Sequence, residues 1–271
     1  MRVRDVGKTH TSAVCDTCPS LDYCLTPSLF NRLQADPSID LRISTYPTSA
    51  WVFRQHQPQV GIHIVCEGSV VVSVERADQR ETVLHIDRRD CIINLEDWVL
   101  ARPTYSISAR ALTDSTIIFI GKDDLRRLFT TDSAIAQIMT FHLARRVELA
   151  QHQHIEQGST DVKARLATAF KELLEATGQQ TMQTAHFEFP VTRQLLADIV
   201  GAAPESISRA LSGFEAEALL TREPSRIVIP DVPRFLAHAA TAAGTPAPEP
   251  PVRANARAPM RMHPAQPRRH R

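Results

Sequence analysis

Apolar and polar residues alternate in many short runs along the first half of the chain, and turn-forming residues separate these runs. Alternation with a period of two is the pattern of a β-strand that buries one face. Many such strands without helices between them are typical of an all-β roll or barrel. We therefore predict a jelly-roll-like β-roll over residues 29–130. Its predicted strands are 41–46, 50–53, 61–65, 69–75, 82–86, 106–111 and 116–120.

After the predicted roll, the apolar pattern changes to the period of an amphipathic helix, and neither Pro nor Gly interrupts residues 132–157. We predict one long helix within residues 131–158. Its apolar stripe could pack on the roll of its own chain. The stripe is longer than a small roll needs, however, which favours a homodimer seam of coiled-coil type. The stripe consists of Ile135, Met139, Leu143 and Val147, with Ile138 and Ala150 beside them.

Residues 159–236 are predicted to form a winged helix-turn-helix domain. Asp161 can cap the first helix and Gly178 can end it, while Gly201 lies in the short turn between two later helices. Helix, short turn, helix and small hairpin is the layout of this domain type. The whole chain is therefore predicted to be an α+β protein. The predicted elements are helix 162–176, strand 187–191, helices 193–200 and 205–216, and a hairpin over 219–229.

The second helix of this unit divides into an apolar and a polar side. Glu205, Ser208 and Arg209 fall together on the polar side. Arg209 can donate two hydrogen bonds to guanine, Glu205 can accept one from a cytosine amino group, and Ser208 can approach a base edge or thymine. These residues are the predicted DNA contacts. The alternatives are a solvated helix face, or a ligand-binding module whose helices bind protein instead of DNA. The apolar side carries Ile207, Leu211, Phe214 and Leu219.

The composition sets limits on the class of protein. The chain has 271 residues, 43% of them hydrophobic, and a formal net charge of +1, so a basic surface requires local segregation of charge. We find neither an apolar run of roughly 20 residues nor the apolar region of a signal peptide, and expect a cytoplasmic protein without a membrane partner. We find no Gly-rich phosphate loop, nucleophile elbow or paired metal-binding histidines, so we do not expect an enzyme.

The last part of the chain, residues 237–271, is predicted to be a disordered basic tail. From about Thr241 onward it is rich in Pro, Ala and Arg, and such a segment cannot bury enough apolar surface to fold. No acidic residue follows Glu249. The tail can therefore attract phosphates weakly and without specificity, or be a solvated segment without a task.

Three of the five cysteines, Cys15, Cys18 and Cys24, lie within ten residues and define a cysteine-rich sensor segment over residues 1–28. Clustered thiols in a cytoplasmic protein are more often metal ligands or redox sensors than disulfides. Thiolates suit an iron-sulfur cluster or zinc, and metal-free redox chemistry is the third alternative. Cys66 is the favoured fourth ligand. Cys91 is the alternative, although core filling explains it, and a histidine or aspartate is a further option.

Three stretches resemble the CRP/FNR superfamily of bacterial transcription regulators, and the resemblance covers roughly residues 15–232. IHIVCEGSVVVSVE looks like the central hairpin of its β-roll, which is the cyclic-nucleotide-binding fold, and DVKARLATAFKELL like the helix that leads into its DNA-binding domain. TRQLLADIVGAAPESISRALSGFEAEALL looks like its helix-turn-helix. The resemblance implies a homodimer that binds double-stranded DNA and works with RNA polymerase.

Within the superfamily, E-x-x-S-R at Glu205, Ser208 and Arg209 is similar to the regulator of fumarate and nitrate reduction. This similarity implies a palindromic target of the TTGAT…ATCAA kind. The C-x2-C-x5-C spacing resembles the iron-sulfur ligands of that regulator, which implies an oxygen-sensing four-iron cluster. Ile118 stands about where the family carries its fourth cysteine.

Cyclic nucleotide is not expected as the effector. Relatives that bind it hold the ribose with a carboxylate and the phosphate with an Arg-Ser pair. Asn94 falls at the first place and Tyr105 with Ser106 at the second. Without a guanidinium, the charge of a buried phosphate would be uncompensated.

Overall fold

The computed structural model describes residues 4–5, 39–76, 81–157, 161–179, 181–187, 192–223 and 226–242. The predicted sensor cysteines Cys15, Cys18 and Cys24 lie outside the described residues, as does the predicted tail beyond Ala242. Among the described helices, none has the length and apolar character that a membrane crossing requires.

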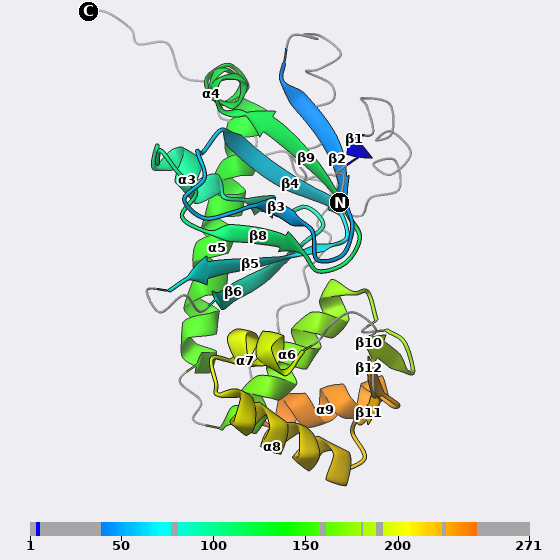
Figure 1. Ribbon diagram of the computed structural model, residues 1–271. Coiled ribbons are helices and arrows are strands. Elements are labelled where there is room, and N and C mark those ends of the chain that lie inside the picture. Colours follow the sequence, from blue (N-terminus) through cyan, green and yellow to red (C-terminus); the bar gives the residue numbers. More distant parts are fainter. Residues whose placement is uncertain are drawn as a thin grey trace, which may run out of the picture.

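The first half of the described chain forms a roll of two antiparallel sheets, and each predicted strand corresponds to one of its strands (Figure 1). One sheet has the order β1-β2-β9-β4-β7 and the other the order β3-β8-β5-β6. The predicted α+β architecture is therefore confirmed. The bounds are β1 Arg4–Asp5, β2 Leu41–Tyr46, β3 Trp51–Phe53, β4 Gly61–Glu67, β5 Ser69–Glu75, β6 Glu81–Arg88, β7 Ile92–Ile93, β8 Ser108–Ala111 and β9 Ser115–Gly121.

Strand β4 is buried on both faces. Ile62 and Ile64 face the outer side of the roll and pack in the cluster that includes Ile135 and Met139, whereas Val65 packs in the cluster inside the roll. A strand covered on both sides loses its alternating pattern, which explains the continuous apolar run here. Gly68 then makes the tight turn into β5 at a φ of +78°, where an added Cβ would lie 2.3 Å from the carbonyl oxygen of Asp114.

Three helices accompany the roll: α3 (Leu95–Val99), α4 (Lys122–Thr131) and α5 (Ser133–Gln157). The sequence analysis predicted only the long one, so residues 95–99 and 122–131 are a correction to the predicted all-β roll. The apolar stripe of α5 divides into two parts. Ile135 and Met139 are fully buried against the chain's own roll, whereas Val147 is 58% exposed. The buried first part of the stripe therefore supports the alternative that α5 packs on the roll of its own chain.

The second half has the predicted helix, turn, helix and hairpin order. A strand was predicted over 187–191. The strand that the structure describes here spans 185–187, and residues 188–191 lie outside the described part. The last helix extends to Ala242, so residues 237–242, which were predicted to belong to the tail, are helical. The bounds are α6 Val162–Ala176, β10 Ala185–Phe187, α7 Arg193–Val200, α8 Pro204–Ala216, β11 Thr221–Glu223, β12 Arg226–Ile229 and α9 Val232–Ala242.

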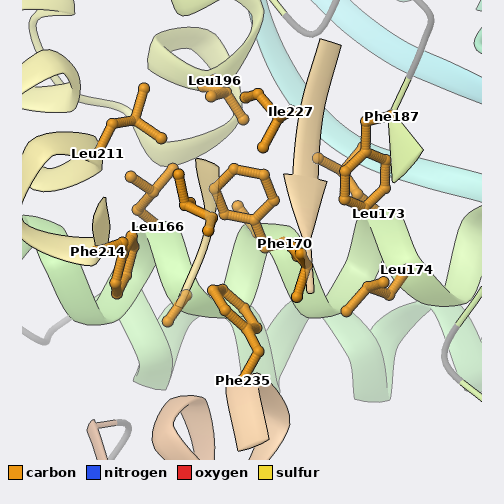
Figure 2. Packing of buried hydrophobic residues seen from close by; sticks show 14 of the residues in the cluster. Leu166, Phe170, Leu173, Leu174, Phe187, Leu196, Leu211, Phe214, Ile227 and Phe235 are labelled. Carbon is orange, nitrogen blue, oxygen red and sulfur yellow. The ribbon is translucent and has the colours of Figure 1, made fainter. Parts of the chain in front are cut away.

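Four phenylalanines form the centre of this second half (Figure 2). The ring centroid of Phe170 lies 5.9 Å from that of Phe187 and 5.7 Å from that of Phe235, and Phe214 lies 5.6 Å from Phe235. These separations are typical of favourable edge and tilted aromatic contacts. The four rings come from α6, β10, α8 and α9. This aromatic core therefore fixes the position of α8 relative to the other three elements.

The same core continues onto the roll. Val71 of β5 and Leu112 are buried in the cluster of the second half, and Val83 and Ile86 of β6 pack against it. An ion pair of 2.9 Å between Arg88 of β6 and Glu175 of α6 borders this contact. The two halves therefore share an apolar interface. Figure 1 shows α6 and α7 beside β6 at this contact.

Candidate DNA-binding surface and effector sites

Helices α7 and α8 begin and end at residues suited to those positions. The Thr192 side chain accepts a hydrogen bond of 3.0 Å from the Leu195 N–H and so caps α7. Gly201 ends α7 with a φ of +67°, in the left-handed region that favours glycine. Pro204 begins α8, where its missing N–H costs no helical hydrogen bond. Local sequence thus fixes the turn that orients α8.

The three predicted DNA contacts share one side of α8. Glu205 and Arg209 are exposed and Ser208 is half-buried, whereas Ile207 and Phe214 are fully buried. Arg209 Nη2 donates a hydrogen bond of 3.2 Å to Ser206 Oγ. A guanidinium has five N–H donors, so this bond orients Arg209 and leaves donors for a partner outside the chain. The first turns of α8 therefore present an acceptor, a hydroxyl and a cation together.

A contact between the wing and α8 was missed by the sequence analysis. Arg222 of β11 bonds to the Glu215 carboxylate and, at 3.1 Å, to Ser212 Oγ, both on α8. The hydrogen bond from Arg222 lowers the pKa of Glu215. Opposite charges seven residues apart across a turn were the available signal, but such spacing does not by itself show that two side chains meet. The contact holds the hairpin against the C-terminal part of α8.

Cys66 and Cys91 are both half-buried. Cys66 lies where the β4–β9 register shifts between Val65 and Glu67, and it packs partly buried against the outer cluster of the roll. Burial, together with the nearby Asp87 charge, raises the pKa of Cys91 to about 12. Cys91 therefore stays a protonated thiol at neutral pH, as expected for core filling. Within the described part of the chain, no group of three His, Cys, Asp or Glu residues could hold a metal ion.

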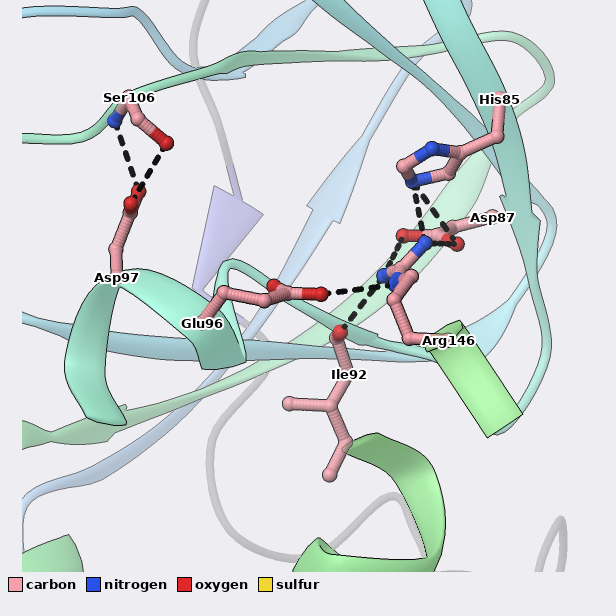
Figure 3. Close-up of polar contacts among 7 residues, drawn as sticks. All are labelled: His85, Asp87, Ile92, Glu96, Asp97, Ser106 and Arg146. Atoms are coloured by element: carbon pink, nitrogen blue, oxygen red, sulfur yellow. Dashed lines mark hydrogen bonds and ion pairs between the residues drawn. The ribbon is translucent and has the colours of Figure 1, made fainter. Parts of the chain in front are cut away.

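A polar cluster centred on Arg146 joins α5 to the roll (Figure 3). Arg146 Nη1 and Nη2 lie 3.0 and 3.1 Å from the two carboxylate oxygens of Asp87, which is only 3% exposed. Arg146 Nε lies 3.1 Å from Glu96 Oε1, and Nη2 donates to the Ile92 carbonyl oxygen at 3.2 Å. His85 contacts both Arg146 and Asp87. Strands β6 and β7, helix α3 and helix α5 thus meet at one guanidinium.

The charges of this cluster depend on one another. Burial alone would raise the pKa of Asp87, but His85 and Arg146 hold it below its ordinary value. Burial likewise opposes the charge of Arg146, yet Asp87 and Glu96 raise its pKa. Both groups therefore stay ionised at neutral pH. A buried charge with several hydrogen bonds is costly to leave without its partner.

The residues at the places where relatives hold a cyclic nucleotide are engaged within the chain. The Ser106 backbone N–H and hydroxyl donate to the Asp97 carboxylate at 2.8 and 2.6 Å. The Tyr105 ring stacks on Phe53 at a centroid distance of 4.2 Å. Asn94 donates to the Gly61 carbonyl oxygen at 2.8 Å. These side chains form contacts within the roll, and none of them carries a guanidinium.

His63 is a buried histidine that the sequence analysis did not single out. Its side chain points into the roll, the residue is 6% exposed, and its Nδ1 lies 3.1 Å from Asn94 Oδ1. Burial lowers the pKa of His63 to about 4, despite the opposing effect of the Asn94 bond, and the Arg42 charge lowers it further. His63 is therefore neutral at pH 7.

Comparison with known proteins gives two family matches. A model described as "Cyclic nucleotide-binding domain" matches residues 43–132, and one described as "Crp-like helix-turn-helix domain" matches residues 164–237. A CRP-like cAMP-activated global transcriptional regulator of Mycobacterium tuberculosis is 24% identical over 190 residues, which cover 70% of this chain and 84% of the relative. The cAMP-activated global transcriptional regulator CRP of Salmonella typhimurium is 23% identical over 207 residues, covering 74% and 98%.

Solved structures share the fold. The c-di-GMP responsive global regulator CLP of Xanthomonas campestris has a TM-score of 0.63 and 24% identity, covering 75% of this chain and 98% of its own. FixK2 from Bradyrhizobium japonicum has a TM-score of 0.57 and 20% identity, covering 72% and 95%. The two-sheet roll followed by a helix-turn-helix unit is thus an arrangement common to these proteins and this chain.

Removing one partner of the buried ion pair should destabilise the protein strongly. Arg146→Met leaves the Asp87 charge buried without its counter-ion, and we expect the free energy of unfolding to fall by about 3–5 kcal/mol. Arg88→Met, which breaks the more exposed pair with Glu175, should cost no more than about 1 kcal/mol. Urea denaturation at one fixed protein concentration measures both. Equal costs for the two variants would contradict the role assigned to Arg146.

Burial of neutral His63 should make stability depend on pH. Its folded pKa of about 4 lies below the unfolded value of 6.5, so the unfolded state binds more protons below pH 6.5. Stability should therefore fall by on the order of 3 kcal/mol as the pH decreases from 7 to 4. His63→Gln cannot titrate and should show a smaller decrease over this range. Denaturant unfolding at several pH values tests this, and parallel pH profiles would rule it out.

Proposed function

Since the chain belongs to the CRP/FNR family of DNA-binding transcription regulators, we propose that it reads a palindromic site through Glu205, Ser208 and Arg209 and senses oxygen or redox state through an iron-sulfur cluster. The observation that carries the DNA-binding part is the placement of these three side chains on the accessible side of α8. They lie in the first turns of the second helix of a helix-turn-helix unit, the part that enters the major groove. A TTGAT…ATCAA palindrome is the proposed target.

A homodimer is the proposed active species, since helix-turn-helix regulators of this kind bind two half-sites about one DNA turn apart. Two large apolar side chains on α5 support it: Phe141 is 38% exposed and Leu149 is 48% exposed, and residues eight apart lie on one side of a helix. Pairing α5 with its copy would remove this apolar surface from water. RNA polymerase is the further proposed partner at the promoter.

Cys66 is the described residue best suited to complete the proposed set of Cys15, Cys18 and Cys24. A β-bulge aims its side chain away from the regular ladder, and it packs on the same outer cluster as Ile118. Ile39, which follows the sensor segment, lies in that cluster too. Four thiolates suit an iron-sulfur cluster, which when bound supplies oxygen-sensitive redox chemistry. Cys91 is less suited, because its thiol is buried and lies near the Asp87 charge, which disfavours a further negative charge there.

The packing around Cys66 offers a route from this site to α5. Ile135 and Met139 of α5 belong to the apolar cluster that Cys66 contacts. A change in bonding at Cys66 would therefore alter the apolar surface on which α5 packs, through direct contacts. A bias of a few kcal/mol between two arrangements of the dimer is enough to change the population that binds DNA. Zinc or metal-free thiol chemistry at the same cysteines is the alternative input.

A cyclic nucleotide is the second candidate effector, because the M. tuberculosis and S. typhimurium relatives are named as cAMP-activated. The contacts inside this roll argue against it. Ser106 is committed to Asp97, Tyr105 stacks on Phe53, and Arg146 is committed to Asp87 and Glu96. At the place where relatives hold the phosphate, a nucleotide would have to break one of these contacts to obtain a partner.

Arg209→Ala should weaken binding to the TTGAT…ATCAA site by about 1–3 kcal/mol and relax the choice at one base pair, because a bidentate contact to guanine is lost. Arg127→Ala, on α4 of the sensory half, is the matched control and should bind as the unmodified protein does. Fluorescence anisotropy with the palindrome and its single-base variants, at one salt concentration, measures both effects. Unchanged affinity and base preference in Arg209→Ala would refute the assignment.

Protein purified without oxygen should be brown, contain iron and sulfide, and bleach in air. Cys66→Ser should lose most of the iron, because a thiolate ligand is removed, while Cys91→Ser should retain it. Visible absorbance with iron, sulfide and zinc analysis of the three proteins provides the test. Colourless protein with stoichiometric zinc would exclude the oxygen sensor, and full iron content in Cys66→Ser would exclude Cys66 as a ligand.

A further inference from the structure

The roll contains a cavity of about 380 Å³ that the proposed function does not use. Its aromatic walls are the rings of Phe53, Tyr105 and Phe119, and both His63 and Arg42 line it. We call this space the roll cavity. Its lining comes from β2, β3, β4, β9 and the loops beside them, and includes no residue of α5 or β6. The roll cavity is therefore distinct from the Arg146 cluster.

The hydrogen bonds of Asn94 determine which nitrogen of His63 carries its proton. Asn94 Nδ2 donates to the Gly61 carbonyl oxygen at 2.8 Å, because a carbonyl can only accept. The Asn94 atom facing His63 Nδ1 at 3.1 Å is then the amide oxygen, also an acceptor. His63 Nδ1 must therefore be the protonated nitrogen. In the neutral ring, Nε2 is left with an acceptor lone pair.

This lone pair has no partner within the described chain, although the His63 side chain is more than nine-tenths buried. The neighbours of the ring are aromatic: its centroid lies 4.8 Å from that of Phe53 and 5.2 Å from that of Phe119. Nε2 keeps contact with the open space of the roll cavity, so a donor that enters the cavity can form a hydrogen bond to it. The hydrogen bond must come from the ligand, because Nε2 cannot donate.

Arg42 supplies a positive charge on the other side of Phe119. Strand β9 lies between β2 and β4 (Figure 1). Phe119 of β9 is paired with Arg42 of β2 and also with His63 of β4. Two strand spacings place the backbones of Arg42 and His63 about 10 Å apart. The Arg42 guanidinium lies 4.2 Å from the Phe119 ring centroid and is paired with Asp40 at 3.1 Å. Its side chain is 55% exposed, so guanidinium donors remain available at the rim.

We propose that the roll cavity binds a small aromatic acid that carries a hydrogen-bond donor on the side of its ring opposite to the carboxylate. The donor, a hydroxyl or ring N–H, binds His63 Nε2, and the carboxylate binds Arg42. The ring lies among Phe53, Tyr105 and Phe119. This inference depends on neither the proposed iron-sulfur cluster nor the proposed DNA target.

Each part of the cavity selects one part of this ligand. Its volume is at the lower end of the range for small-molecule sites, which suits one or two rings. Aromatic walls favour a planar apolar body. Arg42 favours a carboxylate and disfavours a cation. Asp40 already neutralises part of the Arg42 charge, so a singly charged acid fits better than a multiply charged phosphate ester.

Three probes separate these contributions in the full chain at pH 7: 4-hydroxybenzoate, benzoate and phenol. Benzoate lacks the donor and phenol lacks the carboxylate. By isothermal titration, 4-hydroxybenzoate should bind about tenfold more tightly than either, as expected for one hydrogen bond or one ion pair at each end. The ¹⁵N resonance of His63 Nε2 should shift with 4-hydroxybenzoate and not with benzoate.

Protein variants give the matching test without disturbing the core. Arg42→Met changes a rim side chain, and it should reduce the advantage of 4-hydroxybenzoate over phenol from about tenfold to about onefold. Arg54→Met is the control, because Arg54 lies over the Trp51 ring at 4.5 Å outside the cavity lining, and it should keep the full advantage. Equal affinity of the unmodified protein for the three probes, absence of binding, or an unmoved His63 resonance would each overturn the proposal.

Discussion

The guanidinium of Arg146 is the contact on which the arrangement of the roll and its helices depends. A charge removed from water must be matched by nearby opposite charge and hydrogen-bond acceptors, and here Asp87, Glu96 and the Ile92 carbonyl oxygen supply them. These groups come from the strands β6 and β7 and the short helix α3. Because the bonds are directional, they fix the rotation and height of α5 over the roll more narrowly than apolar packing alone does.

The two-faced burial of β4 separates the two sensing sites that we propose. Successive side chains of a strand point to opposite faces. Ile62, Ile64 and Cys66 therefore belong to the cluster between the roll and α5, whereas His63 and Val65 belong to the roll interior. One strand thus carries a thiol toward α5 and an imidazole toward an internal cavity.

Local pattern was enough to predict most elements of this fold. The strands alternate or form apolar runs between turn formers. Helices α6 and α7 begin at residues whose side chains cap them, and α8 begins at a proline. Helix α3 was missed because five residues are too short for a periodic signal. Helix α4 was missed because its charged sequence follows a strand directly. The end of α9 was missed because its alanines merge with the composition of the predicted tail.

The candidate sites were predicted only where they are local in sequence. Glu205, Ser208 and Arg209 lie within one helix, so the helical period alone places them on one side. Asp87 and Arg146 are 59 residues apart, and nothing in either neighbourhood indicates that they meet. The same holds for Arg42, Phe119 and His63, which the sheet register brings together. Helical periodicity could not show which surface the apolar stripe of α5 covers. The structure shows that Ile135 and Met139 cover the chain's own roll.

The apolar contact between the two halves ties the orientation of α8 to the amount of apolar surface that is exposed to water. Val71, Leu112, Val83 and Ile86 of the roll are covered by the domain that carries α8. Any rotation of α8 that leaves this contact exposes apolar surface, and such exposure raises the heat capacity. Reorientation of the DNA-reading helix would then have an enthalpy that changes with temperature. A regulator built in this way has a switching equilibrium that depends intrinsically on growth temperature, whatever its chemical effector.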